Sequence, residues 1–286
     1  MIFDFQGSLA GEMMDHGFLA ADSMLRRPML WPETYIDHLP DVIVVSSRHA
    51  AQLLVDHFAC PSERIHIIPD SVGTETLHPA SSQQHARELR QQLGIPLADR
   101  VVVYLGLLAE YQGLSLLLHA AQEVLGLHKD VHFLIMGHPN VEHYRDLAGG
   151  MGLSDQVTFT GRIPYGQAHR CLNLGEVVAA PEISATEGSG KLPNYMALGL
   201  ATVAFDTPVS REHMGPWGVY AALGDPHSLA RGIVSLLQDP QRRAVLGNGL
   251  RDRAVELYSE SPFQDRLGEL YATRLGPGRS APLSAA

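Results

Sequence analysis

Short apolar runs of strand length alternate with amphipathic helical patterns along almost the whole chain. This alternation is typical of a parallel β-sheet covered by helices, so the sequence predicts an α/β fold. The runs are continuous in Val, Ile and Leu, which predicts strands buried on both faces. Helices are expected in most of the gaps, for example at Arg48 to His57 and Gly113 to Leu125. The strands are expected at Ile2 to Phe5, Val42 to Ser46, Arg64 to Pro69, Val101 to Gly106, His132 to Gly137, Val157 to Thr160, Val177 to Ala180 and Ala201 to Phe205.

A Pro-, Ser- and Gln-rich stretch from His78 to Gln84 separates two such blocks and is the best candidate for a linker. The block before it holds few strands for a Rossmann-like domain, and its first strand follows Met1 directly, so we expect the chain to begin inside a fold. The predicted organisation is a partial Rossmann-like domain over residues 1–80 and a complete one over 81–255. Gln241 to Leu275 is expected to form two helices, and residues 276–286 a disordered tail.

Composition excludes several classes of protein. With 286 residues and a formal net charge of -10, the chain lacks the positive surface that nucleic acids require, so no nucleic-acid partner is expected. The two cysteines, Cys60 and Cys171, lie far apart and form no CxxC motif, which predicts small core residues rather than a disulfide or a thiolate zinc site. No apolar run is long enough to span a bilayer, so we expect a cytoplasmic protein, with peripheral association at the inner face of the membrane left open.

The most informative segment runs from Ala180 to Gly199 and has the pattern of a strand, a glycine-containing loop and a helix. Such a loop at the carboxyl end of a parallel strand presents backbone N–H groups that can bind a phosphate or diphosphate. Lys191 lies in this loop and is one of only two lysines, the other being Lys129. A compact ammonium group suits a phosphate, so Lys191 is a candidate ligand; the alternative is a solvated loop lysine.

Two better-known phosphate motifs do not fit. A P-loop would need Gly at position 185 and Ser or Thr after Lys191, where this chain has Ala185 and Leu192. The segment after Gly106 lacks the spaced glycines of a dinucleotide fingerprint, which disfavours NAD-linked chemistry.

Other catalytic patterns are also missing. No GxSxG elbow is present, so a serine hydrolase has no support. His128 and His132 have the spacing of helical metal ligands, but the turn between them places them on no common helix face, so no metal site is proposed. Glu176 and Glu182 are expected to cap helices or face solvent rather than to act in catalysis.

An ordered series of short motifs carries a resemblance to a known family. The chain resembles the GT-B glycosyltransferases of family 4, and the resemblance covers nearly its whole length. The motifs are Ile68-Pro69-Asp70-Ser71-Val72, Tyr104-Leu105-Gly106, Ile135-Met136-Gly137, Phe159-Thr160-Gly161-Arg162-Ile163-Pro164, Glu187-Gly188-Ser189-Gly190 and Met196-Ala197-Leu198-Gly199.

This resemblance implies two facing Rossmann-like domains, an acceptor domain first and a nucleotide-sugar domain second. It implies that residues 1–80 are the last part of an acceptor domain and that residues 256–275 form a helix returning to it. The implied activity is a hexosyltransferase-type, retaining transfer from a nucleoside diphosphate sugar to an acceptor, without a metal or other cofactor. Cell-envelope or polysaccharide synthesis is the implied setting, and the sequence leaves the oligomeric state unknown.

The resemblance also implies roles for the loop. Glu187 matches the glutamate that touches the donor sugar, and the backbone N–H groups of the following glycine segment would hold the diphosphate. A second family glutamate, which binds the ribose, falls on Tyr195, and two family cations fall on Leu107 and Gln112. We therefore expect Lys191 to take over part of the neutralisation of the diphosphate. The donor-binding candidates are Gly106, Gln112, Gly137, His138, Arg162, Glu187, Gly188, Ser189, Gly190, Lys191, Leu192 and Tyr195.

On the acceptor side, a polar, glycine-rich segment follows the first strand. Family members have a histidine near the sugar at about the position of Gln6, and His16 lies close by in sequence, with Glu12 and Asp15 as further alternatives. Together with Glu187, Gln6 and His16 are therefore the catalytic candidates. Because the leaving phosphate can itself assist deprotonation of the acceptor, we expect electrostatic stabilisation of the diphosphate to dominate.

Two other functions share this fold and stay open at the level of sequence. The short acceptor domain and the substituted donor-site positions also fit a non-catalytic GT-B binding module. A sugar-nucleotide epimerase with the same fold would need no acceptor, and formation of an epimer from the donor alone would distinguish it from a transferase.

Overall fold

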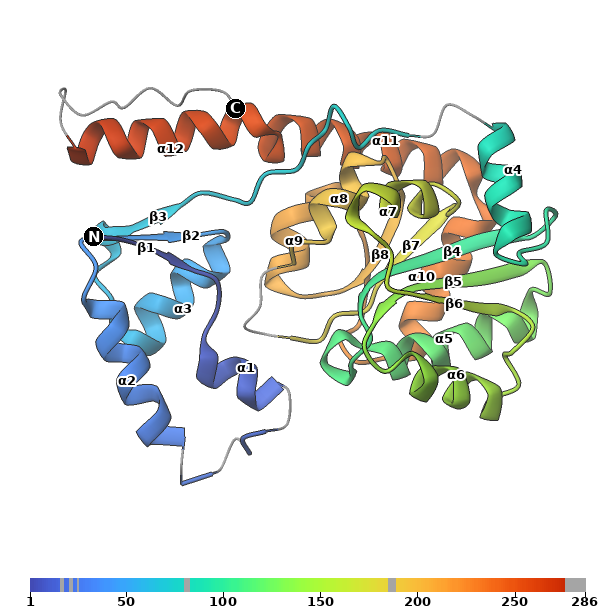
Figure 1. Ribbon diagram of the computed structural model, residues 1–286, viewed down its shortest axis with the longest axis horizontal. Helices are drawn as coiled ribbons and strands as arrows, with labels where there is room; N and C mark the ends of the chain where they lie inside the picture. Colours follow the sequence, from blue (N-terminus) through green and yellow to red (C-terminus); the bar gives the residue numbers. More distant parts are fainter. Residues whose placement is uncertain (16–17, 21–22, 25, 80–82, 185–188, 276–286) are drawn as a thin grey trace.

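The chain folds into two α/β lobes that are joined by a long helical segment (Figure 1). A computed structural model describes residues 1–15, 18–20, 23–24, 26–79, 83–184 and 189–275. The first lobe contains a parallel sheet in the order β1-β2-β3, formed by Ile2–Phe5, Val42–Val45 and Ile65–Ile67. Its helices are α1 (Leu9–Asp15), α2 (Arg26–His38) and α3 (Arg48–Phe58).

The second lobe is built on a six-stranded parallel sheet. Its strand order is β6-β5-β4-β7-β8-β9, with every pairing parallel. The strands are β4 (Arg100–Leu107), β5 (Val131–His138), β6 (Val157–Gly161), β7 (Val177–Ala180), β8 (Thr202–Phe205) and β9 (Val219–Ala221). Its helices are α4 (Gln83–Gln92), α5 (Leu114–Leu127), α6 (Val141–Gly150), α7 (Tyr165–Leu172), α8 (Leu192–Ala197), α9 (Pro208–Met214), α10 (Pro226–Gln238) and α11 (Pro240–Tyr258), and α12 (Glu260–Leu275) follows and returns to the first lobe.

The large sheet is buried on both faces, as its apolar runs predict. Successive residues of β4 alternate between two cores: Val102 and Tyr104 pack with α5, α6 and α10, whereas Val101 and Val103 pack with α7, α8 and α11. This is the period-two geometry of a strand with apolar side chains in both directions. Both cysteines are free and buried, also as expected.

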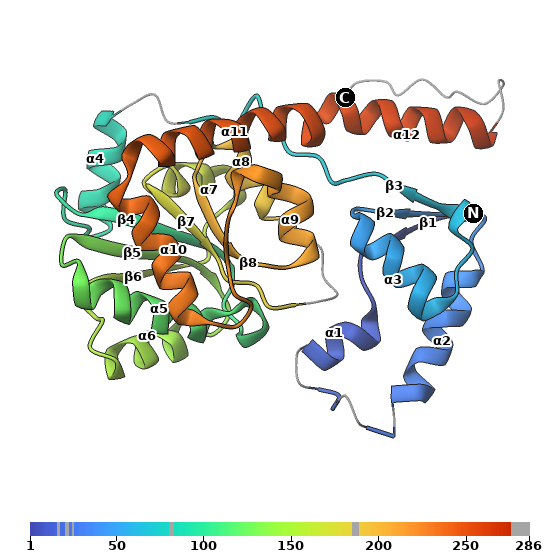
Figure 2. The ribbon, with the colours of Figure 1, turned by 180° about the vertical axis from the view of Figure 1, so that it is seen from behind.

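The last two helices connect the lobes (Figures 1 and 2). Helix α11 packs on the second lobe, and α12 extends over the sheet of the first. Phe263, Leu267 and Leu270 follow one another at the spacing of a helix face and pack against Val42 and Ile68. The break between the two helices lies at Ser259, so the part that covers the first lobe begins at Glu260.

All the expected strands are present, within a few residues of their predicted ends. The sequence reading missed β9, because Val219–Ala221 is too short to show a periodic pattern. Within the described ranges, no helix combines the length and apolar character that crossing a bilayer requires. The predicted tail, residues 276–286, lies outside the described residues.

Candidate functional site

The strand order reverses between β4 and β7, in the middle of the large sheet. From β4 the chain proceeds outward through β5 to β6, and from β7 it proceeds outward in the opposite direction through β8 to β9 (Figure 1). In open parallel sheets the connections diverge at such a point and leave a crevice at the carboxyl ends of the strands, where ligands bind. A ligand is therefore expected at the loops after Leu107 and Ala180.

These two loops touch each other. Gly113, at the start of α5, has a φ of +75°, and a Cβ atom there would lie 1.8 Å from the carbonyl oxygen of Pro181. Nearby, the backbone N–H of Ile183 donates to the carbonyl of Tyr111, with an N···O distance of 3.2 Å. Only glycine allows both this conformation and this approach, so Gly113 fixes how closely the loop after β7 packs against the loop after β4.

Four of the predicted donor-binding residues lie along the carboxyl edge of β4, β5 and β6. Gly106 and Gly137 are register partners on β4 and β5, and a Cβ on Gly137 would lie 1.7 Å from the carbonyl oxygen of Gly106. His138 follows at the end of β5, and Arg162 comes directly after β6; both are exposed. The fold thus places these residues on one edge of the sheet.

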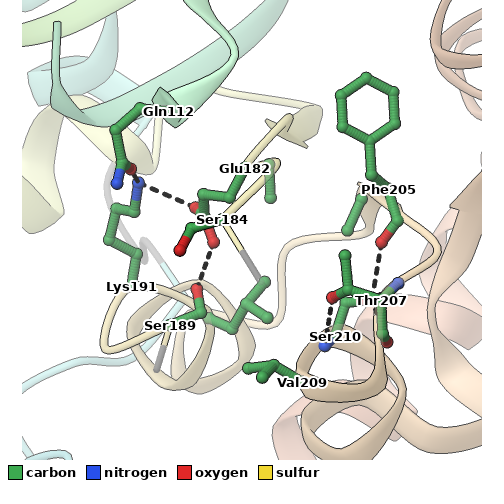
Figure 3. A pocket seen from close by; sticks show the side chains of 12 residues that line it. Gln112, Glu182, Ser184, Ser189, Lys191, Phe205, Thr207, Val209 and Ser210 are labelled. Atoms are coloured by element: carbon green, nitrogen blue, oxygen red, sulfur yellow. Dashed lines mark hydrogen bonds and ion pairs between the residues drawn. The ribbon is translucent and has the colours of Figure 1, made fainter. Parts of the chain in front are cut away.

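Lys191 is the centre of a polar network in the crevice (Figure 3). Its ammonium nitrogen lies 2.8 Å from Glu182 Oε1 and also donates to Gln112 Oε1. The hydroxyl of Ser189 donates to the other carboxylate oxygen of Glu182, with an O···O distance of 2.6 Å. The side chain of Lys191 therefore extends from the loop before α8 back to the loop after β4.

The ion pair at the centre of this network is largely enclosed. The side chains of Lys191 and Glu182 are only 21% and 17% exposed. Burial by itself raises the pKa of the Glu182 carboxyl, but the Lys191 ammonium and the Ser189 hydroxyl outweigh it and hold that pKa below its usual range. The ammonium also lies 5.2 Å from the centre of the Tyr104 ring. The site thus keeps the Glu182 carboxylate ionised in a poorly hydrated place.

The remaining wall of this pocket comes from β8 and the start of α9. Thr207 caps α9: its hydroxyl accepts from the N–H of Ser210, and the Ser210 hydroxyl accepts from the N–H of Thr207. The Ser210 hydroxyl also donates to the carbonyl of Phe205, with an O···O distance of 2.7 Å. The enclosed space is about 30 Å³, enough for one or two small polar groups.

Two sequence-based interpretations need correction. Tyr195, expected to bind the donor, is fully buried instead: its hydroxyl donates to the carbonyl of Leu105 at 2.6 Å and accepts from the N–H of Leu105 at 3.2 Å. Strands β4 and β7 pair only as far as Val103, so the phenol satisfies the backbone of β4 where the strands separate. Glu182, expected to cap or face solvent, is instead the buried partner of Lys191.

The other predicted residues fall into several groups. Leu192, a donor-binding candidate, is buried in the core, and Gln112 is buried with its side-chain oxygen bonded to Lys191. Gln6 is exposed at the end of β1, on the other lobe. Ser189 is buried and Gly190 exposed at the start of α8. His16, Glu187 and Gly188 lie outside the described residues.

The two histidines with helical spacing do not meet. His132 is buried on β5, and its Nε2 lies 2.8 Å from the hydroxyl of Thr158, whereas His128 is the C-cap of α5. Elsewhere in the described part of the chain, no three His, Cys, Asp or Glu side chains gather as metal ligands would. Glu176 forms a partly buried ion pair with Arg243, with an N···O distance of 2.8 Å.

Comparison with known proteins identifies the fold and the family of the chain. The two lobes and the site at the switch point define a GT-B fold, and HepE from Anabaena, in a crystal structure with UDP and glucose, superimposes with a TM-score of 0.81. That alignment covers 95% of this chain and 71% of HepE, at 16% sequence identity. The family model "Glycosyl transferases group 1" matches residues 85–253, more than half of the chain. The chain belongs to this family.

Curated relatives support the same placement. A D-inositol 3-phosphate glycosyltransferase from Acidothermus cellulolyticus is 27% identical over 259 residues, which cover 84% of this chain and 55% of that protein. A phosphatidyl-myo-inositol mannosyltransferase from Mycobacterium leprae is 29% identical over 210 residues, covering 72% of this chain and 53% of that protein. The chain thus spans about half the length of the curated relatives it matches.

Proposed function

We propose that the protein is a retaining glycosyltransferase that takes a sugar from a nucleoside diphosphate sugar. The observation that carries this proposal is the position of the Lys191 ammonium, which lies beside Gln112 at the carboxyl edge of the sheet's switch point. A dinucleotide or nucleotide-sugar diphosphate carries its negative charge at this place in Rossmann-like folds. The names of the relatives support a glycosyltransferase, and the UDP bound to HepE supports this class of donor.

In this proposal, Lys191 supplies the positive charge that stabilises the diphosphate as it leaves. Its side chain reaches the loop after β4 although it belongs to the loop before α8, so one lysine serves both loops. The backbone N–H groups of Ser189 and Gly190, which precede it in sequence, would donate to the phosphate oxygens. Interactions of this kind act where charge develops, and they are strongest where water is excluded.

The proposed transfer needs no metal. The leaving phosphate oxygen would accept the proton of the acceptor hydroxyl as the bond to the sugar breaks, and the acceptor would attack from the same face, which retains the configuration. Glu187 and the acceptor-side residues Gln6 and His16 stay candidates for contacts with the sugar. We also propose a cytoplasmic location, with which the free thiols of Cys60 and Cys171 are compatible.

A panel of UDP, GDP, ADP and their sugar conjugates in a thermal-shift assay tests the proposal. A ligand at about 100 Kd stabilises the folded state by about 2.7 kcal/mol, which gives a measurable rise in Tm. Lys191→Met should reduce the shift by about half or more, and Lys129→Met, the exposed second lysine, is the matched control. EDTA should leave both binding and transfer unchanged. If no nucleotide binds, or if both lysine variants bind equally, the proposed role of Lys191 is wrong.

A further inference from the structure

A second, larger cavity lies between the two lobes. It has a volume of about 890 Å³, within the range of small-molecule sites. The first lobe contributes the first turn of α3 and the end of β3, the second lobe contributes α9, and the inter-lobe helices α11 and α12 close it (Figure 2). The charged residues that line it include Arg48, Arg211, Glu212, Arg253 and Arg266.

The lining is strongly basic although the chain as a whole is acidic. Four arginines and a single acidic residue, Glu212, are among the described residues that line it, whereas the net charge of the chain is -10. The overall composition therefore does not account for the charge of this cavity. Arginines at this density repel one another, so an arrangement of this kind is stabilised by an anionic ligand.

The arginines differ in how far the protein already neutralises them. Arg211 forms a two-pronged ion pair with Asp206, with N···O distances of 2.6 and 2.7 Å. Arg253 donates to two backbone carbonyls, those of Glu212 and His213, and so holds α9 in place. Within the described part of the chain, Arg48 and Arg266 form no ion pair with a carboxylate, and they come from two different elements, α3 of the first lobe and α12, which packs on that lobe's sheet.

Glu212 offsets only one of the four positive charges, and its carboxylate also has a structural role. Both of its carboxylate oxygens accept from the backbone N–H of Arg48, at 2.9 Å each. The carboxylate therefore binds the amino-terminal end of α3, where the helix dipole favours an anion, and links the two lobes. The guanidinium groups of Arg48 and Arg266 keep their donors for another anion.

From these observations we propose that this cavity binds a phosphate group carried by the acceptor. The planar guanidinium fork matches the tetrahedral oxygens of a phosphate monoester or diester, and arginine is the preferred residue for such recognition. Apolar side chains in the same lining, Ile67, Leu257 and Tyr258, would contact the uncharged part of the molecule. The phosphate belongs either to a free polyol phosphate or to a lipid headgroup, which share this chemistry.

The basic cavity lies next to the donor pocket, where an acceptor would have to bind. Both cavities use the first turn of α9: Thr207 and Ser210 line the donor pocket, whereas Pro208 and Arg211 line the basic cavity. A phosphate held on one side of this turn would anchor the acceptor beside the pocket that we assign to the sugar donor. The proposal that the bound molecule is an acceptor rests on the proposed glycosyltransferase function, but phosphate binding can be measured independently of that function.

Direct binding to the complete 286-residue chain tests the proposal. Calorimetric titration with inositol 3-phosphate, with uncharged inositol as the comparison, should show binding of the phosphate ester alone. Arg48→Gln and Arg266→Gln should each weaken it about tenfold or more, since each removes a charge-assisted contact. Arg242→Gln, an exposed arginine of α11 outside the cavity, removes the same charge and should leave the affinity unchanged.

Vesicles distinguish the two sources of phosphate. A lipid headgroup would be identified by selective binding to vesicles with phosphatidylinositol over pure phosphatidylcholine, with that binding lost in Arg48→Gln and Arg266→Gln. Binding of the free ester but not of the vesicles would identify a soluble acceptor. The proposal is overturned if neither binds, or if all three arginine variants bind alike. UDP titrations of the same variants report on the donor site separately, so a failure of phosphate binding with intact UDP binding refutes the acceptor site alone.

Discussion

Replacing Glu182 by glutamine separates two roles that the Lys191 ammonium can have. In the structure this ammonium is neutralised by Glu182 at 2.8 Å, in a place where both side chains are mostly enclosed. If the ammonium binds a diphosphate, the carboxylate competes with that ligand for it. Glu182→Gln keeps the shape of the side chain and removes the competing charge, so the affinity for a nucleoside diphosphate should rise.

The expected size follows from the geometry. The Glu182 carboxylate and a diphosphate bound at Lys191 would be two negative charges about 5 Å apart. At an effective dielectric constant of about 20 they repel each other by about 3 kcal/mol, and partial screening at the mouth of the pocket reduces this to about 1.5 kcal/mol. The affinity should therefore improve roughly tenfold. Lys191→Met removes the cation itself and should weaken binding by about 1.5 to 3 kcal/mol, the range for a charge-assisted hydrogen bond.

Stability gives an independent measure of the same pair. Lys191→Met leaves a buried carboxylate without its cation and should lower the free energy of unfolding by about 3 to 5 kcal/mol. Glu182→Gln should cost less, because the ammonium keeps Gln112 and the Tyr104 ring as partners. The double variant should be more stable than the sum of the single losses predicts, since the two residues interact directly.

Urea unfolding of the four proteins and calorimetric titration with UDP measure these quantities. Lys129→Met serves as the control for loss of a lysine. If Glu182→Gln weakens UDP binding as much as Lys191→Met does, the carboxylate itself contacts the donor and the reasoning about competition is refuted. If the two losses of stability are simply additive, the pair does not act as a coupled unit in solution.

Three further predictions concern other residues. Gly113→Ala should destabilise the protein by several kcal/mol and abolish nucleotide binding, because its Cβ would collide with Pro181; urea unfolding and a UDP thermal shift measure both effects. Tyr195→Phe should lower stability by about 1 to 3 kcal/mol by leaving the backbone of Leu105 unpaired, yet keep the affinity for UDP; a large loss of affinity with normal stability would return Tyr195 to the donor site. Burial, reinforced by the neighbouring Glu33 carboxylate, raises the pKa of Asp37 to about 6, so the folded state holds this proton more tightly than the unfolded state, and stability falls as the pH rises from about 4 to 6. Asp37→Asn should remove that fall and add up to about 3 kcal/mol at pH 7, whereas an unchanged pH profile of unfolding would contradict this.

Much of the fold could be predicted from local patterns. Apolar runs such as those of β4 and β5 predicted buried strands, since a strand covered on both faces must be apolar at every position. The ordered motifs then indicated the family, and the segment from Ala180 to Gly199 indicated where a phosphate would bind. These features are readable because each depends on neighbouring residues along the chain.

The sequence by itself determined the class of fold, the order of its elements and the loop that carries Lys191. Only the tertiary structure decided that this lysine pairs with Glu182 and reaches Gln112, 79 positions away, and that Tyr195 faces inward. The basic cavity likewise depends on the tertiary structure, because the Arg48–Glu212 contact that brings α3 to α9 joins residues 164 positions apart. The physical reason is that periodicity records which residues are buried, whereas the partner of a buried polar group depends on how separate elements pack.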